Sequence, residues 1–161
     1  TIRLVFLTSE WYNLTNKTEP KEGTIMVQLI VGVKGEGKTK KMLEHVHNIL
    51  ASTDGNVVYL DKSTQNMHEL DNRVRLINVT EYPIQNTDQF IGFVCGICSQ
   101  DYDLQEIYLD GFLKIAKLEG QDISSTLSQL NQISEQFHVN MVLSVSMAKD
   151  QIPEFAKGQI I

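Results

Sequence analysis

The sequence predicts an α/β fold of three layers, in which helices cover both faces of a mainly parallel five-stranded sheet. From Met26 onward, short apolar runs of strand length alternate with longer segments whose apolar residues recur at helical spacing. Parallel strands need such long connections, because each must cross back to the same end of the sheet. With 161 residues, the chain has the length of one compact domain.

Five segments have the length and composition of strands. They are rich in Val, Ile, Leu and Tyr, and turn residues introduce several of them, as Thr53-Asp54-Gly55 does for the second. The predicted strands are Val27–Gly32, Asn56–Asp61, Val74–Val79, Glu106–Asp110 and Asn140–Ser146.

Three longer segments are predicted helices. Lys38–Leu50 and Ser124–Phe137 place their apolar residues three or four positions apart, which is typical of a helix with one buried face. Asn86–Gln100 has its start signalled by Thr87-Asp88. After Pro153, the sequence indicates only a short helix and an apolar end.

The first 25 residues differ from the rest of the chain. A short apolar piece, Leu4 to Leu7, is followed by a polar, turn-rich stretch, and the apolar piece is too short for a signal peptide. We expect residues 1–25 to be an N-terminal extension. It is either an upstream leader or an extra edge strand anchored by Trp11 and Tyr12.

The composition indicates a soluble protein without a membrane span. Hydrophobic residues make up 42% and charged residues 21% of the chain, and no run reaches the ~20 apolar residues that a membrane helix needs. A net charge of −6 gives no indication of nucleic-acid binding, since phosphate contacts favour Lys and Arg.

The two cysteines, Cys95 and Cys98, lie in an apolar helical segment with CxxC spacing. A zinc site would need two further ligands, and a redox pair would need an exposed thiolate at a helix start. We interpret both as buried structural residues, with a functional role as the alternative. Thiols in this setting fit a reducing, cytoplasmic compartment. The four histidines give no clear metal-ligand pattern.

The segment GVKGEGKT, Gly32 to Thr39, lies between the first strand and the first helix. Glycines let a loop turn its backbone N–H groups inward around an anion, and the helix that follows presents its positive N-terminus to the same anion. A lysine and a hydroxyl residue complete the pattern GxxxxGK[ST], in which Lys38 would reach the β and γ phosphates and Thr39 would hold Mg²⁺.

This segment resembles the Walker A motif of the P-loop NTPases, and the resemblance extends from Met26 to Ser146. It implies that residues 26–161 form a nucleotide-binding domain that takes ATP and Mg²⁺. We expect the side chain of Glu36, inside the loop, to point to solvent. The implied nucleotide-binding residues are Gly32, Val33, Lys34, Gly35, Glu36, Gly37, Lys38, Thr39 and Lys40.

A second motif, Ile107-Tyr108-Leu109-Asp110, resembles the Walker B form, in which a buried strand ends in an acid that helps to hold Mg²⁺. By itself the pattern is weak, because a strand-ending Asp before Gly is also an ordinary turn. One extra strand between the two motifs is similar to the additional-strand, RecA-like group. That resemblance implies the strand order 5-1-4-3-2.

The residues that would activate water are less clear. Many proteins of that group carry a glutamate directly after the Walker B aspartate, but Gly111 stands there. Asp61, at the end of the second strand, is the first substitute as a catalytic base, and Glu119 is another. Ser144 and Ser146 resemble the polar sensor position that reports on the γ-phosphate.

The leading functional hypothesis is a slow or partner-stimulated Mg²⁺-dependent ATPase, in which Lys38, Asp110 and Asp61 are the catalytic residues. The chain is similar to small bacterial ATP-binding proteins often grouped with twitching-motility, pilus-retraction ATPases, but the likeness to the motors is confined to the Walker motifs. The first alternative is a nucleotide-gated interaction module with little hydrolysis, whose partner surface would be residues 80–105. Its partner would be another protein or a second copy of the chain. A small-molecule kinase is less favoured, because Arg73 and Arg75 are the only arginines in the core sequence.

Overall fold

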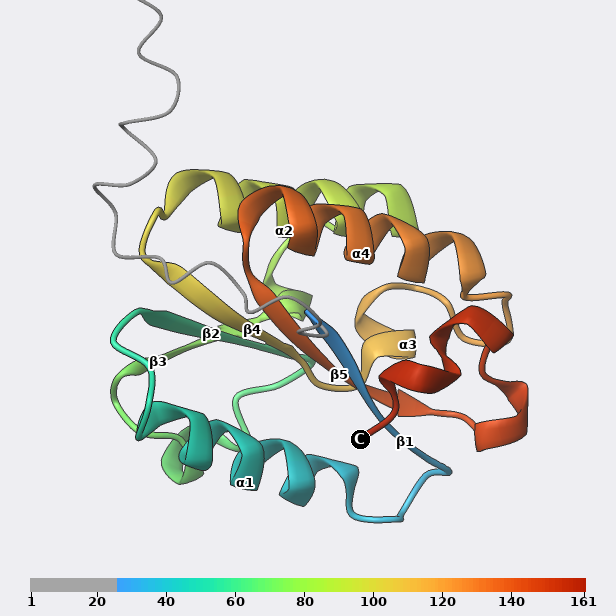
Figure 1. Ribbon diagram of the computed structural model, residues 1–161, viewed down its shortest axis with the longest axis horizontal. Helices are drawn as coiled ribbons and strands as arrows, with labels where there is room; N and C mark the ends of the chain where they lie inside the picture. Colours follow the sequence, from blue (N-terminus) through green and yellow to red (C-terminus); the bar gives the residue numbers. More distant parts are fainter. Residues whose placement is uncertain (1–25) are drawn as a thin grey trace, which may run out of the picture.

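The computed structural model describes residues 26–161, which form an α/β fold around one five-stranded sheet (Figure 1). All paired strands run parallel. The predicted fold class, with helices on both faces of the sheet, is confirmed. The strands are β1 (Val27–Gly32), β2 (Asn56–Asp61), β3 (Val74–Asn78), β4 (Leu104–Leu109) and β5 (Asn140–Ser146).

β4 begins two residues earlier than predicted and stops at Leu109, so that Asp110 is the first residue after the strand.

The connections between the strands are mostly helical. The α-helices are α1 (Lys38–Leu50), α2 (Thr87–Gln100), α3 (Phe112–Ile115) and α4 (Ser124–Phe137). The 3₁₀ helices are η1 (Met67–Glu69), η2 (Val79–Glu81), η3 (Lys149–Gln151) and η4 (Glu154–Gln159).

The helices divide unequally between the two faces of the sheet (Figure 1). α1 covers one face, where Met42 and Val46 pack against the rings of Tyr59 and Tyr108. α2, α3 and α4 contribute to the larger apolar cluster on the other face. Cys98 is buried in this larger cluster, as predicted, whereas Cys95 packs against it half-buried.

The strand order is β1-β5-β4-β2-β3, so the predicted order 5-1-4-3-2 is wrong. β1 lies at one edge of the sheet instead of between β5 and β4, and β2 rather than β3 lies next to β4. The burial of the strands gives a physical reason for the second difference. β2 is buried from Val57 to Asp61 and suits the interior, whereas β3 is half-exposed along most of its length and suits an edge.

The outer edge of β1 is covered by the last residues of the chain. The backbone N–H of Ile161 donates to the carbonyl oxygen of Leu29 at 2.9 Å. The Gln159 side chain donates to the carbonyl of Val27 at 3.0 Å. These bonds occupy backbone acceptors that an open edge would offer to another chain.

Because the strands are parallel, their carboxyl ends lie together at one end of the sheet, across the strand direction from the edges formed by β1 and β3. β1, β2, β4 and β5 end there at Gly32, Asp61, Leu109 and Ser146. The loops that follow these strands therefore meet in space although they lie far apart in the sequence.

Two other predictions concern the N-terminal extension and membrane-spanning helices. The N-terminal extension, residues 1–25, lies outside the described residues, and its alternatives as leader or edge strand stay predictions. Within residues 26–161, no helix has the length and apolar character to cross a membrane.

Candidate functional site

A cleft of about 500 Å³ opens at the carboxyl ends of the strands. It is bounded by the glycine-rich loop after β1, by the turns after β2 and β4, and by the end of β5. The residues that line it are Lys34, Gly35, Gly37, Lys38, Thr39, Asp61, Lys62, Ser63, Gln65, Asn66, Asp110, Gly111, Ser144 and Ser146.

The glycine-rich loop depends on glycine at two positions. Gly35 and Gly37 have φ angles of +92° and +74°, in the left-handed region that side chains disfavour. Gly37 is the N-cap of α1, so the N-terminus of this helix lies directly after the loop. The Lys38 ammonium donates to the carbonyl oxygen of Val33 at 3.0 Å, which holds the lysine across its own loop.

Glu36 departs from the expectation that its side chain points to solvent. The residue as a whole is exposed, but its carboxylate accepts a hydrogen bond from the backbone N–H of Val33 at 3.2 Å. The same carboxylate lies against Gly32, where a Cβ atom would collide with it. Gly32 thus provides the space into which the Glu36 side chain folds.

Asp110 is the most connected side chain of the cleft. Its Oδ1 accepts from the Ser144 hydroxyl at 2.6 Å, and its Oδ2 accepts from the Tyr59 hydroxyl at 2.8 Å. The Thr39 hydroxyl lies 3.4 Å from Oδ1, which is longer than an ordinary O–H···O hydrogen bond. The two shorter hydrogen bonds therefore hold the Asp110 carboxyl group in one orientation, and the hydroxyl oxygen of Thr39 lies beside it.

Gly111 explains why no glutamate follows Asp110. Its φ angle is +69°, so a residue with a side chain would be strained at this position. Its N–H donates to the Ser144 hydroxyl at 2.7 Å, and that hydroxyl in turn donates to Asp110. The turn after β4 is thus fixed to β5.

Asp61 lies next to Asp110 because β2 and β4 are neighbours in the sheet. Leu60 is paired with Leu109, so the two acids follow directly after paired residues. The Asp61 carboxylate accepts from the N–H of Lys62 at 2.6 Å and from the Asn66 amide at 3.1 Å. Burial, and then the nearby charge of Asp110, raise the pKa of Asp61 above its ordinary value.

A pair of stacked tyrosines lies beneath the cleft. The rings of Tyr59 and Tyr108 are 5.8 Å apart and nearly parallel, and the Tyr108 hydroxyl lies 2.7 Å from Nδ1 of His45 on α1. Burial raises the pKa of both tyrosines and lowers that of His45. The tyrosine hydroxyls therefore keep their protons and can act as hydrogen-bond donors.

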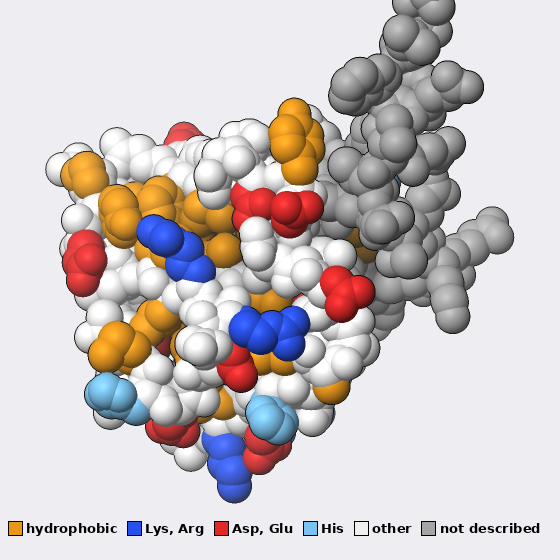
Figure 2. All heavy atoms as spheres, turned by 90° about the vertical axis from the view of Figure 1, so that its left-hand side faces the viewer, with side chains coloured by type: hydrophobic (Ala, Val, Ile, Leu, Met, Phe, Trp, Pro, Cys, Tyr) orange, Lys and Arg blue, Asp and Glu red, His pale blue; other side chains and the backbone are white. Residues whose placement is uncertain are grey.

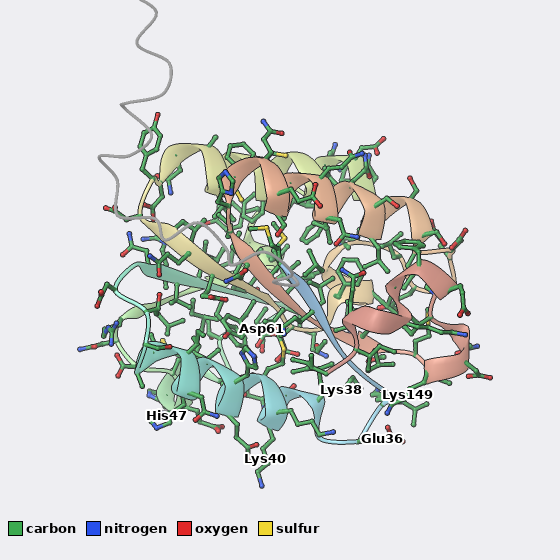
Figure 3. All side chains as sticks on the ribbon, viewed as in Figure 1. Glu36, Lys38, Lys40, His47, Asp61 and Lys149 are labelled. Atoms are coloured by element: carbon green, nitrogen blue, oxygen red, sulfur yellow. The ribbon has the colours of Figure 1, made fainter. Side chains whose placement is uncertain are left out.

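The predicted site residues divide into two groups. The cleft brings together most of them, including both acids and both serines, whereas Glu119 lies in a neighbouring hollow. Gly32, Val33, Glu36 and Lys40 do not line the cleft. Figure 3 shows Lys40 pointing from α1 into solvent, where its ammonium lies 4.0 Å from the Glu44 carboxylate.

Sequence reasoning missed three residues that hold the acids in place, namely Tyr59, Lys62 and Asn66. Tyr59 was not identifiable, because strand periodicity gives the face of a side chain and not its partner across the sheet. Asn66 carried a weak signal, since a polar, turn-rich segment directly follows a strand that ends in Asp.

The two arginines among residues 26–161, Arg73 and Arg75, do not line the cleft. The Arg73 guanidinium donates to the carbonyl oxygens of Leu50 and Thr53 at 3.0 and 2.8 Å, and so fixes the end of α1. Arg75 is exposed on β3, at the edge of the sheet farthest from β1 in strand order. The positive charges that line the cleft are those of lysines.

A metal ion would have few protein ligands in this cleft. Among residues 26–161, no group of three or more His, Cys, Asp or Glu side chains is placed to hold a metal. Thr39 and Asp110 present oxygen atoms side by side, which is the kind of donor that Mg²⁺ prefers. An ion bound here would need oxygen ligands from another molecule to complete its coordination.

Neither a scan against models of protein families nor a search of curated proteins finds a match for this chain.

Proposed function

We propose that the protein binds ATP with Mg²⁺ and hydrolyses it slowly, or rapidly only when a partner is bound. One observation carries the proposal. The Thr39 hydroxyl lies 3.4 Å from Asp110, although 71 positions separate them in the sequence, and both line one cleft with Lys38. A glycine-rich loop, a lysine, a hydroxyl and an acid at the end of another strand of the sheet are the parts that phosphate and Mg²⁺ binding need.

The loop and α1 would hold the phosphates. The backbone N–H groups around Gly35 and Gly37, together with the N-terminus of α1, offer hydrogen bonds and a partial positive charge to an anion. Lys38 would exchange its contact with the Val33 carbonyl for the β and γ phosphates. The exchange replaces a hydrogen bond from the ammonium to a neutral carbonyl oxygen by one to a negatively charged phosphate oxygen, which is the stronger of the two.

Thr39 and Asp110 would hold Mg²⁺. Magnesium is usually bound by one or two carboxylates with phosphate oxygens and water, so a single acid with a hydroxyl beside it would be a sufficient protein contribution. The ion would supply positive charge to the phosphates. Ser144 and Tyr59 orient Asp110 for this role through the hydrogen bonds that they donate to it.

Asp61 is the candidate base for the attacking water. It lies beside Asp110 in the same cleft, and its raised pKa makes it a better proton acceptor than an ordinary aspartate. Ser146 also lines the cleft and could contact the γ-phosphate. Hydrolysis would then use a base from β2 in place of the glutamate that Gly111 excludes.

The alternative is a nucleotide-gated interaction module with little hydrolysis. The observation that favours it concerns the transition-state clamp, because no arginine of the described residues, 26–161, lines the cleft. A partner protein or a second copy of the chain would then supply the arginine, or would respond to the bound nucleotide without hydrolysis.

The test compares wild type with Lys38→Ala, and Lys41→Ala serves as a control of equal charge on the exposed side of α1. We measure ATP binding by calorimetry and phosphate release, each with and without Mg²⁺. Lys38→Ala should weaken ATP binding at least about tenfold, since one charge-assisted contact to phosphate is removed. Lys41→Ala should bind like wild type.

The outcomes separate the hypotheses. Phosphate release that needs both Mg²⁺ and Lys38 would establish an ATPase. Lys38-dependent binding without release would favour the gated module. If wild type does not bind ATP, the proposal is wrong.

A further inference from the structure

A second hollow of about 370 Å³ opens beside the cleft. The two share Lys34, Lys62, Gly111 and Ser146 as lining residues, so they are contiguous. The second hollow extends away from the glycine-rich loop toward α3. Lys114 of α3 and Glu119 line this hollow and not the cleft.

Three lysines from three separate segments meet in this hollow. Lys34 comes from the glycine-rich loop, Lys62 from the turn after β2, and Lys114 from α3. Within residues 26–161 the ion pairs are Lys40–Glu44 and Lys157–Glu154, so none of these three charges is neutralised by an ion pair there. Glu119 also lines the hollow, so its lining carries three lysines and one acid, and this excess of positive charge attracts an anion.

This concentration of charge contrasts with the rest of the molecule. The chain carries a net charge of −6. On the face shown in Figure 2, at the opposite end of the sheet from the glycine-rich loop, basic side chains are scattered among acidic and apolar ones. The face in Figure 2 is therefore not a continuous basic surface, in contrast to the three lysines that meet in the hollow.

We propose that the second hollow binds the phosphate group of a small molecule, directly beside the nucleotide of the proposed function. Lysines bind phosphate as point charges, and three of them match a doubly charged phosphate monoester. The volume leaves room for a group attached to the phosphate. Glu119 would accept a hydrogen bond from a hydroxyl or amine of that group.

The binding of a phosphate-bearing ligand at this place is distinct from the binding of the nucleotide itself. A ligand in the hollow would contact Lys114, Leu113 and Glu119, which do not line the cleft. The inference rests on the proposed function only in placing a nucleotide in the adjoining cleft. Lys114 can therefore be changed without altering the lining of the cleft.

The experiment titrates inorganic phosphate into the protein saturated with Mg²⁺ and a non-hydrolysable ATP analogue, and follows binding by NMR shifts of backbone amides. The analogue fills the γ-phosphate position, so phosphate can bind only elsewhere. Wild type is compared with Lys114→Gln and with Arg75→Gln, a control that removes one exposed charge on β3. Calorimetry measures binding of the analogue to each protein.

Wild type should bind phosphate in a saturable way, with shifts near Gly111 and Gly120. Lys114→Gln should weaken phosphate binding about fivefold or more and leave analogue affinity unchanged, whereas Arg75→Gln should change neither. Equal phosphate affinity in wild type and Lys114→Gln, or no saturable binding, would overturn the inference. If the analogue does not bind, the proposed function fails separately, and the dependence on Lys114 is then decided in the nucleotide-free protein.

Discussion

At the scale of the residue, the main feature is the pair of buried acids, Asp61 and Asp110. Both are about 5% exposed or less, and they follow paired residues of adjacent strands. Asp110 accepts hydrogen bonds from neighbouring hydroxyls, whereas Asp61 accepts them from the N–H of Lys62 and the amide of Asn66. Burying two carboxyl groups side by side costs stability, and such costs are typical of functional sites.

The variant Asp61→Asn should be more stable than wild type at pH 7, by a few degrees of melting temperature. Burial and Asp110 raise the pKa of Asp61, so the folded protein holds this proton more tightly than the unfolded chain does. The contribution of Asp61 to stability is therefore greatest at low pH and is lost as the pH rises through its raised pKa. Asparagine does not titrate, so the advantage of the variant should disappear on acidification.

Asp122→Asn provides a control of opposite sign. Hydrogen bonds from Ser124 lower the pKa of Asp122, so its contribution is present at neutral pH and is lost as the pH falls. Thermal unfolding from pH 3 to pH 8 measures both variants. An Asp61→Asn protein that is less stable than wild type at pH 7 would contradict the argument.

If Asp61 is the base, the same variant should also lose most of the ATPase rate.

At the scale of the element, the pairing of β2 with β4 brings together the two acids and a pair of tyrosines, one of which donates to Asp110. Tyr59 and Tyr108 are paired across these strands, and their rings stack beneath α1. Their hydroxyls have different partners, because Tyr59 donates to Asp110 and Tyr108 contacts His45. The same layer of the core thus fixes the cleft on one side and α1 on the other.

Tyr59→Phe should lower the free energy of unfolding by about 1–3 kcal/mol, because a buried carboxylate oxygen loses its donor while the packing of the ring is kept. Tyr108→Phe should cost only about 1 kcal/mol, because His45 is half-exposed and water can replace the lost partner. Urea unfolding measures both values.

Of the two variants, only Tyr59→Phe should also weaken Mg²⁺-dependent nucleotide binding, since Tyr59 donates a hydrogen bond to Asp110 and Tyr108 does not. Equal Mg²⁺ dependence in the two variants would contradict this positioning role.

At the scale of the whole molecule, the two edges of the sheet are protected in different ways. β3 is a short edge strand with an exposed charge at Arg75. The edge at β1 is covered by the segment after Pro153, through the hydrogen bonds of Gln159 and Ile161. Both devices reduce pairing with other chains.

Gln159→Ala should destabilise the protein by about 1 kcal/mol, because the side chain donates to the Val27 carbonyl and to the Asn131 side chain. It should also increase self-association at high concentration, since the β1 edge is less firmly covered. Thermal unfolding and light scattering measure the two effects. Lys157→Ala, which removes only an exposed ion pair with Glu154, is the control and should change neither.

The local features of this protein could be predicted from the sequence. The extents of β1, β2, β5, α1 and α4 follow from apolar spacing, which reports which face of an element is buried. The glycines at positions 35 and 37 could be recognised, because glycine is the residue that adopts positive φ angles without strain. The positions of Asp61, Ser144 and Ser146 at strand ends also followed from the sequence.

The tertiary structure decided which strands are neighbours. Spacing along the chain does not encode strand order, and the order taken from a resemblance was wrong. That order separated β2 from β4, yet their direct pairing is what places Asp61 and Tyr59 against Asp110. The sequence by itself determined the five strands, the three long helices and the strand-end residues, because these depend on local periodicity and backbone preference. Only the tertiary structure decided the contacts among them, because these depend on how whole faces pack.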